Sequence, residues 1–239
     1  CPRYDAAWAE RTRAEMTRQA FAEEFDLDFA ASGDAVFDLD ALAHCKVGWN
    51  PSPDGCSRFI NAWDIGRRHD HTVGITIGLR GDTWHVVEYD RFLLPYPIIE
   101  QRIEDRARLR RATTVVESNG IGDPVIEHLA VRVTPYTTTT RTKIQAIQAL
   151  QMLIEQGRFK HGIEQLDREL QAYELDDDGL IQDSVMAAAI AAMTAVPPPS
   201  RLGQAIGAEM STPREVTVQE RLAERRARLA VAGGRMGWR

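Results

Sequence analysis

About a quarter of the way along the chain the apolar pattern changes abruptly, and this change constrains the fold more than any other feature. Residues 58–65, 72–79 and 83–93 are rich in Val, Ile, Thr, Trp and Tyr, which is typical of β-strands. The links between them, residues 66–71 and 80–82, are short, as in connections between antiparallel neighbours. The pattern therefore predicts a three-stranded antiparallel sheet.

Beyond these strands, predicted helices alternate with short strands. The further strands are expected at 113–117 and 131–136. Asp123 is the expected N-cap of a short helix that starts at Pro124. The other helices are expected at residues 97–111, 142–156 (with Gly157 as the stop), 163–173 and from 183 to the Pro tract at 197–199. This order predicts an α/β fold, in which a mixed five-stranded sheet is flanked by helices.

Three acidic residues occupy matched places in this arrangement. Asp64 ends the first strand, Glu117 ends the strand at 113–117, and Asp183 opens an alanine-rich helix. Two strand ends and a helix start can meet at one point, where carboxylates hold divalent ions that cleave phosphodiesters. Each residue alone also fits an ordinary role: a turn carboxylate for Asp64, a cap for Glu117 and a helix N-cap for Asp183.

Composition narrows the functional classes. The chain has 239 residues, an apolar fraction of 44% and a net charge of −6, which describe a globular protein without the basic footprint of a high-affinity DNA-binding module. An enzyme whose carboxylates are neutralised by metal remains compatible with that charge. No apolar run is long enough to span a membrane, and three cysteines without a C-x-x-C pair favour a reducing setting over a zinc site. No Walker A motif occurs.

Cations near these acids are candidates for contacts to a phosphate backbone. Arg141 and Lys143 follow a run of four threonines, and such a loop offers hydroxyl, N–H and cationic donors. A solvated loop and helix start is the alternative. Arg67 and Arg68 lie just after Asp64 and are further candidates. Asp70 could turn back towards the same site, or be a plain hairpin residue.

At this point the chain resembles the nuclease domain of the large terminase subunit of tailed bacteriophages. The resemblance covers about residues 58–195 and rests on Trp-Asp-Ile-Gly-x4-Asp at 63–70, Val-Val-Glu-Ser-Asn-Gly-x-Gly at 115–122, Lys143, and Asp-Ser-Val-Met-Ala at 183–187. It implies a ribonuclease H-like fold. The opening segment resembles the stretch that joins the family's ATPase domain to its nuclease. Since the chain starts with Cys, we expect it to be a piece of a longer protein.

The resemblance implies a metal-dependent endonuclease that cuts concatemeric double-stranded viral DNA during packaging. Its metal ligands correspond to Asp64, Glu117 and Asp183, with Asp70 at a further acidic position, and its cofactors are Mg²⁺ or Mn²⁺, as two ions. The implied partners are DNA, the portal protein, the small terminase subunit and the ATPase domain of the same polypeptide, with no membrane, in the host cytoplasm. Gln182 stands where the family often has an acid or His.

The resemblance also implies a domain division. Residues 1–56 are expected to be a linker segment from an ATPase domain, 57–196 the nuclease, and 197–239 a Pro-rich linker and tail. Residues 201–239 hold eight Arg against four Glu, so this tail is basic. From its Pro-rich entry and its Gly-Gly pair we expect this tail to be flexible.

Three other classes stay open. A ribonuclease H-like resolvase or integrase-type nuclease would share the fold and the acids. A sugar-kinase-like ATPase would need a duplicated domain, for which 239 residues leave little room. A non-catalytic docking module, with a basic tail that grips a packaging partner, would show no metal dependence.

Overall fold

The computed structural model describes residues 8, 10, 12, 15–17, 36–66, 70–119, 122–173 and 182–196. The chain divides into two units, Cys1–Pro198 and Pro199–Arg239, and every described element belongs to the first. None of the described helices has the length and apolar character that a membrane crossing requires.

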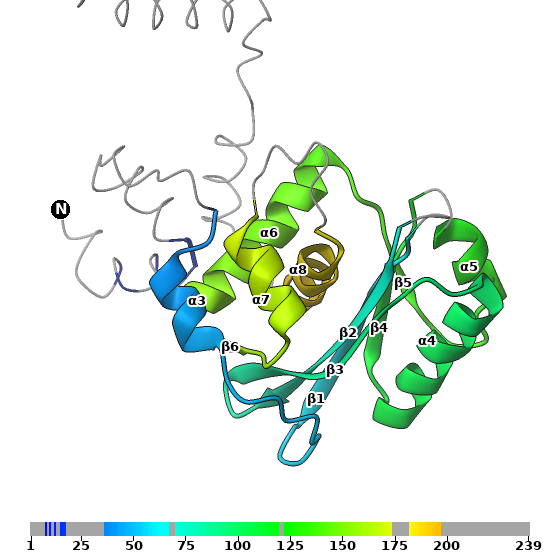
Figure 1. Ribbon diagram of the computed structural model, residues 1–239, viewed down its shortest axis with the longest axis horizontal. Helices are drawn as coiled ribbons and strands as arrows, with labels where there is room; N and C mark the ends of the chain where they lie inside the picture. Colours follow the sequence, from blue (N-terminus) through cyan, green and yellow to red (C-terminus); the bar gives the residue numbers. More distant parts are fainter. Residues whose placement is uncertain are drawn as a thin grey trace, which may run out of the picture. The chain divides into compact units, whose positions relative to one another are not determined.

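The first unit is a mixed sheet between two layers of helices (Figure 1). The strands are β1 (Arg58–Asp64), β2 (Thr72–Arg80), β3 (Thr83–Phe92), β4 (Thr113–Glu117), β5 (Thr134–Tyr136) and β6 (Phe159–Lys160). The helices are α3 (Leu39–Cys45), α4 (Tyr96–Arg110), α5 (Gly122–His128), α6 (Thr140–Glu155), α7 (Glu164–Gln171) and α8 (Asp183–Ala195). Helices α4 and α5 lie on one face of the sheet, and α3, α6, α7 and α8 on the other (Figure 1).

The strand order is β5-β4-β1-β2-β3-β6. Strands β1, β2 and β3 are antiparallel neighbours, as the short links predicted, whereas β4 is parallel to β1 and β5 is parallel to β4. The α/β class and the ribonuclease H-like arrangement of a mixed sheet flanked by helices are therefore confirmed. This topology brings the carboxyl ends of β1 and β4 to the same edge, which is where ligands bind in α/β sheets.

Alternation along β1 divides the core between the two faces. Ile60 and Ala62 belong to the larger cluster, which includes α6 and α8, whereas Trp63 belongs to a smaller cluster with Ile99 and Ile103 of α4. The alanines of α8 allow this helix to pack closely on the sheet, since Ala187, Ala188, Ala189, Ala191 and Ala192 are all 0% exposed. Asp64 continues the Ile60–Ala62 series, so its side chain is on the α8 face.

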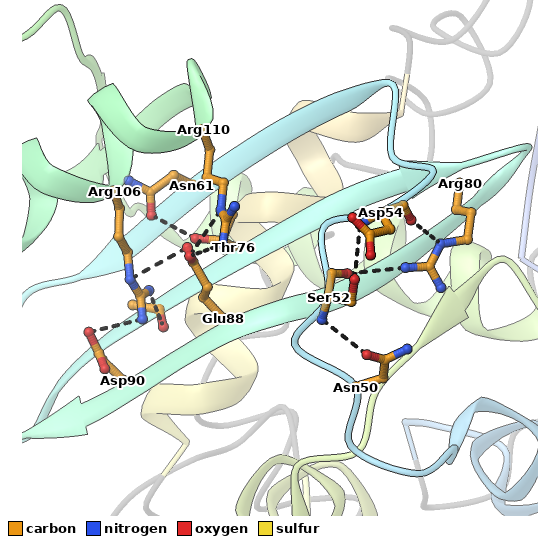
Figure 2. A network of polar contacts seen from close by, with 11 residues as sticks. Asn50, Ser52, Asp54, Asn61, Thr76, Arg80, Glu88, Asp90, Arg106 and Arg110 are labelled. Atoms are coloured by element: carbon orange, nitrogen blue, oxygen red, sulfur yellow. Dashed lines mark hydrogen bonds and ion pairs between the residues drawn. The ribbon is translucent and has the colours of Figure 1, made fainter.

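The α4 face also carries charged residues (Figure 2). Arg106 of α4 is buried, lies 2.9 Å from the Asp90 carboxylate and 3.8 Å from that of Glu88, and donates to the carbonyl of Gly74. Arg110 lies 2.9 Å from Glu88. These contacts tie α4 to β2 and β3 by charge as well as by apolar packing.

Some predictions were wrong in detail. The sheet has a sixth strand, β6, which pairs with β3 and is too short to leave an apolar pattern in the sequence. Helix α5 starts at Gly122, so Asp123 lies in its first turn and is not its N-cap. Helix α6 starts at Thr140 instead of 142, because Thr139 and Thr142 form a capping box. The predicted stop at Gly157 is confirmed by its φ of 68°.

The domain boundaries stay a prediction. Within the segment expected to be a linker, Phe37, Leu42 and Cys45 are buried and belong to the larger core cluster. The Pro tract at 197–199 and the basic tail lie outside the described residues.

Candidate active site

The ends of β1 and β4 bring two of the predicted acids together. In the parallel register of these strands Trp63 is opposite Val116, so the next residues, Asp64 and Glu117, are neighbours at the carboxyl edge. Glu117 is close enough to raise the pKa of Asp64, both through side-chain hydrogen bonding and through its negative charge.

Burial raises the pKa of Asp64 well above its ordinary value, and the hydrogen bond and negative charge of Glu117 raise it further. The charges of Asp183 and Glu169 act in the same direction. The pKa of Asp64 is thus raised by all three of the other acids. A cation bound here would reduce the repulsion between these carboxylates.

The third acid, Asp183, is the first residue of α8 and is half-buried. Burial and the charge of Glu169 raise its pKa, while Arg91 and His71 lower it. The Arg91 guanidinium lies 3.7 Å from the Asp183 carboxylate. Asp183 is therefore within electrostatic reach of Asp64 and is held by an ion pair to β3.

Two glycines allow the chain to turn sharply beside these carboxyls. A Cβ at Gly66 would overlap the main chain of Asp70 and His71, and the N–H of Gly66 donates to the hydroxyl of Thr72 at 3.1 Å. A Cβ at Gly122 would overlap the carbonyl oxygen of Glu117. The glycines of both predicted motifs are therefore needed for close backbone approach next to Asp64 and Glu117.

Asp70 lies at the margin of this group. It is exposed, and it lines a surface pocket with Gly66, Thr72 and residues 92–96. Its charge raises the pKa of Asp183 slightly, as the last of the causes, but it is not among the charges that raise the pKa of Asp64. Its role as a metal ligand stays a prediction.

The predicted DNA-contacting residues are placed in part. Arg141 is exposed and Lys143 is half-buried, both at the start of α6. The threonine loop before them is held beside Glu117, since the side-chain amide of Asn119 makes two hydrogen bonds to the main chain of Thr138, at 2.6 and 3.0 Å. Arg67 and Arg68 lie outside the described residues.

Sequence reasoning missed two residues of this site, Glu169 and Arg91. Glu169 of α7 is 5% exposed and reaches the first turn of α8. Arg91 lies near the end of β3, where it pairs with Asp183. Neither residue belongs to a recognisable motif, and only the packing of α7 and β3 against α8 brings them to the acids.

No family model matches the chain, and no curated protein matches it. Among solved structures, the large-terminase nuclease of the thermophilic phage G20c with bound magnesium superposes with a TM-score of 0.57 at 20% identity, over 67% of this chain and 97% of that one. The nuclease domain of a Thermus phage large terminase gives a TM-score of 0.55 at 18% identity, over 66% of this chain and 93% of that one. A large terminase from another thermophilic bacteriophage gives 0.60 at 13% identity, over 78% and 51%. The chain has the fold of a phage large-terminase nuclease domain.

The terminase nuclease fold raises the question of whether these residues fit a divalent metal. All the candidate donors are carboxylate oxygens, which suit Mg²⁺ and Mn²⁺. Within the described ranges, however, no group of three or more His, Cys, Asp or Glu side chains is spaced as metal ligands. Asp64 and Glu117 end neighbouring parallel strands, and the Asp183 carboxylate is paired with Arg91. The donor chemistry therefore fits a divalent metal, with Asp183 shared between Arg91 and the site.

Proposed function

We propose that this chain is a metal-dependent endonuclease that cleaves double-stranded viral DNA concatemers during genome packaging. The observation that carries the proposal is the half-buried Asp64 at the end of β1, which lies beside Glu117 at the end of β4 and whose pKa is raised by the charges of Glu117, Asp183 and Glu169. Gathering like charges in a buried place costs stability, so it points to a function that needs them. The DNA substrate is supported by the fold, because the solved structures that share it are large terminases and their nucleases.

Asp64, Glu117 and Asp183 are the residues we assign to the metal. These three carboxylates would together hold Mg²⁺ or Mn²⁺, as two ions in our proposal, with Asp70 as a further candidate ligand at the margin. Two such ions activate the attacking water and stabilise the leaving oxygen in phosphodiester cleavage. The G20c nuclease has also been solved with zinc and with cobalt.

The strand ends and glycine turns supply the rest of the catalytic arrangement. They hold the carboxyls on the rigid edge of the sheet, and Arg141 and Lys143, together with Arg67 and Arg68, would contact the phosphate backbone. Because the net charge is −6, DNA affinity of the chain by itself should be weak and sensitive to salt. In a packaging motor, the portal protein, the small terminase subunit and an ATPase domain would deliver the DNA in the host cytoplasm.

The test is cleavage of supercoiled plasmid by the 239-residue protein with Mn²⁺. Wild type should nick and then linearise the plasmid, and EDTA should stop it. Asp64→Asn should slow cleavage by more than the roughly 100-fold that loss of an outer-shell partner can cost. Asp105→Asn, at an exposed position of α4, is the matched control and should cut at the wild-type rate. An intact plasmid with wild type, or equal rates for wild type and Asp64→Asn, would sink the assignment.

One observation favours a second candidate, a docking module without catalysis. The described part of the chain contains no ready-made set of three metal ligands. A docking module would bind a packaging partner without metal and would leave the plasmid intact at every Mn²⁺ concentration. A resolvase or integrase-type nuclease would instead cut branched or end-joined DNA in preference to plain duplex. The same assay, with a four-way junction as a second substrate, separates these outcomes.

A further inference from the structure

Glu169 of α7 caps the start of the neighbouring helix α8. The residue before α8, Gln182, makes no side-chain cap hydrogen bond. Instead, Oε2 of Glu169 accepts from the N–H of Ser184 at 2.8 Å and from the N–H of Val185 at 3.3 Å. The first N–H groups of a helix have no partner within the helix, so a buried helix start needs an acceptor from elsewhere. Helix α7 supplies it.

The other oxygen of Glu169 is also occupied. Oε1 accepts from the hydroxyl of Ser184 and from the side-chain amide of Gln165, both at 2.8 Å. Four donors thus converge on two oxygens of a side chain that is 5% exposed. A glutamine could offer only one acceptor oxygen, and its NH₂ group would face donors. The position is built for a carboxylate.

The capped residue is next to Asp183. Fixing the N–H of Ser184 fixes the peptide that joins it to Asp183, and hence the place from which the Asp183 side chain starts. The hydroxyl of Ser184 is also 3.0 Å from that of Tyr89 on β3, so the start of α8 is tied to the sheet as well. Any movement of Asp183 towards Asp64 and Glu117 would therefore be by side-chain rotation from a fixed backbone.

The charge of Glu169 reaches the site although its oxygens do not face solvent. The carboxylate of Glu169 is hydrogen-bonded to Ser184, the residue that follows Asp183, so its negative charge lies close to the proposed ligand. A negative charge near carboxylate ligands favours a cation beside them. Gln182, the neighbour of Asp183 on the other side, brings no charge.

We propose that Glu169 is a positioning residue of the metal site, which fixes the start of α8 opposite Asp64 and adds a negative charge behind the ligands. The presence of a metal rests on the proposed function. The helix cap rests on the hydrogen bonds of Glu169. It names no contact between Glu169 and the metal or the DNA. The side chain acts through Asp183, as the outer partners of metal ligands do.

The experiment compares Glu169→Gln with Asp167→Asn in the 239-residue protein. Asp167 lies on the same helix, is equally buried at 5% exposed and pairs with Lys46 at 2.6 Å, but its charge is not among those that act on Asp64 or Asp183. Mn²⁺ affinity is measured by calorimetric titration, and folding by thermal unfolding in EDTA. Amide hydrogen exchange at Ser184 and Val185 reports the cap directly, with no metal present.

Glu169→Gln should weaken Mn²⁺ binding by about tenfold or more and speed exchange at both amides. Asp167→Asn should lower the unfolding temperature while leaving Mn²⁺ affinity within about twofold of wild type, because second-site effects without contact to the ligands are small. Unchanged affinity in Glu169→Gln, or an equal loss in Asp167→Asn, would overturn the inference, and so would a wild type that binds no Mn²⁺. A wild type that binds Mn²⁺ without cutting DNA would refute the proposed function and leave the role of Glu169 supported if the affinities differ as stated.

Discussion

The acidic side chains on the two faces of the sheet differ in how many cationic partners they have. On the α4 face, Glu88 and Asp90 lie beside Arg106 and Arg110, so two negative charges meet two positive ones (Figure 2). Arg106 also lies over the ring of Trp63, 5.1 Å from its centroid. Buried charges are tolerated where each has an opposite partner, and this face satisfies that condition.

On the α8 face, four acids meet a smaller positive charge. Glu117, Asp183 and Glu169 all raise the pKa of Asp64, and Arg91 pairs with Asp183 at the longer distance of 3.7 Å. On the α4 face the acids and the arginines match, and we call it the balanced face. On the α8 face the acids outnumber their cationic partners, and we call it the unbalanced face. In our proposal a metal cation supplies the missing positive charge there.

The largest loss of stability is expected when Arg106 is removed from the balanced face. Arg106→Ala leaves Asp90 partly buried without its guanidinium, while Glu88 keeps Arg110, so we expect a loss of about 3 kcal/mol in the free energy of unfolding. Urea denaturation measures it. Arg108→Ala, which removes an exposed pair with Glu104 on the same helix, should cost far less, because exposed ion pairs contribute little to stability. Similar losses for the two variants would show that the buried network contributes no more than a surface ion pair.

The unbalanced face should be sensitive to backbone bulk. In Gly122→Ala the new Cβ overlaps the carbonyl of Glu117, so the loop must shift, with a loss of about 1–3 kcal/mol in the free energy of unfolding and slower plasmid cleavage. Gly48→Ala is the control, because a Cβ there meets nothing within 4 Å. If Gly122→Ala matches wild type in unfolding and cleavage, the close approach does not position Glu117.

The unbalanced face should also give the metal-free protein an unusual pH dependence. The pKa of Asp64 is raised in the folded state above its ordinary 3.8, so between these two values the folded chain binds more protons than the unfolded chain. The stabilisation is complete below 3.8 and is lost as the pH rises through the folded pKa. In EDTA, wild type should therefore lose stability relative to Asp64→Asn with rising pH. Parallel urea-unfolding profiles for the two proteins would show that Asp64 titrates normally.

The smallest effect is expected for Arg141, an exposed residue at the start of α6. Arg141 is exposed, so Arg141→Ala should leave the unfolding temperature unchanged. If it contacts a phosphate, the slope of log affinity for duplex DNA against log salt should fall by about 1. Fluorescence anisotropy at several salt concentrations measures this slope, with cleavage blocked by EDTA. An unchanged slope would remove Arg141 from the DNA-contacting residues.

Much of the fold could be predicted because its signals are local. The strands at 58–65, 72–79 and 83–93 agree with β1, β2 and β3 to within one residue at each end, since β-branched and aromatic runs bounded by short links specify antiparallel neighbours. Strand β6 could not be found in this way, because two residues have no periodicity. Its place is set by pairing with β3.

In the candidate site, too, the residues with local sequence signals could be predicted and the others could not. Asp64 and Glu117 could be placed together because they end strands whose parallel pairing follows from the element order. Glu169 and Arg91 could not, since each looks in the sequence like one charge among many. Their partners depend on how α7 and β3 meet the start of α8. Contacts of this kind arise only from tertiary packing.

The most direct test of the central claim is anomalous diffraction from crystals soaked in Mn²⁺. We predict a manganese peak about 2.0–2.3 Å from carboxylate oxygens of Asp64 and Glu117, with Asp183 turned towards it. The paired acids of the α4 face, Glu88 and Asp90, should attract none. Peaks absent from the Asp64–Glu117 edge, or present only at Glu88 and Asp90, would contradict the account.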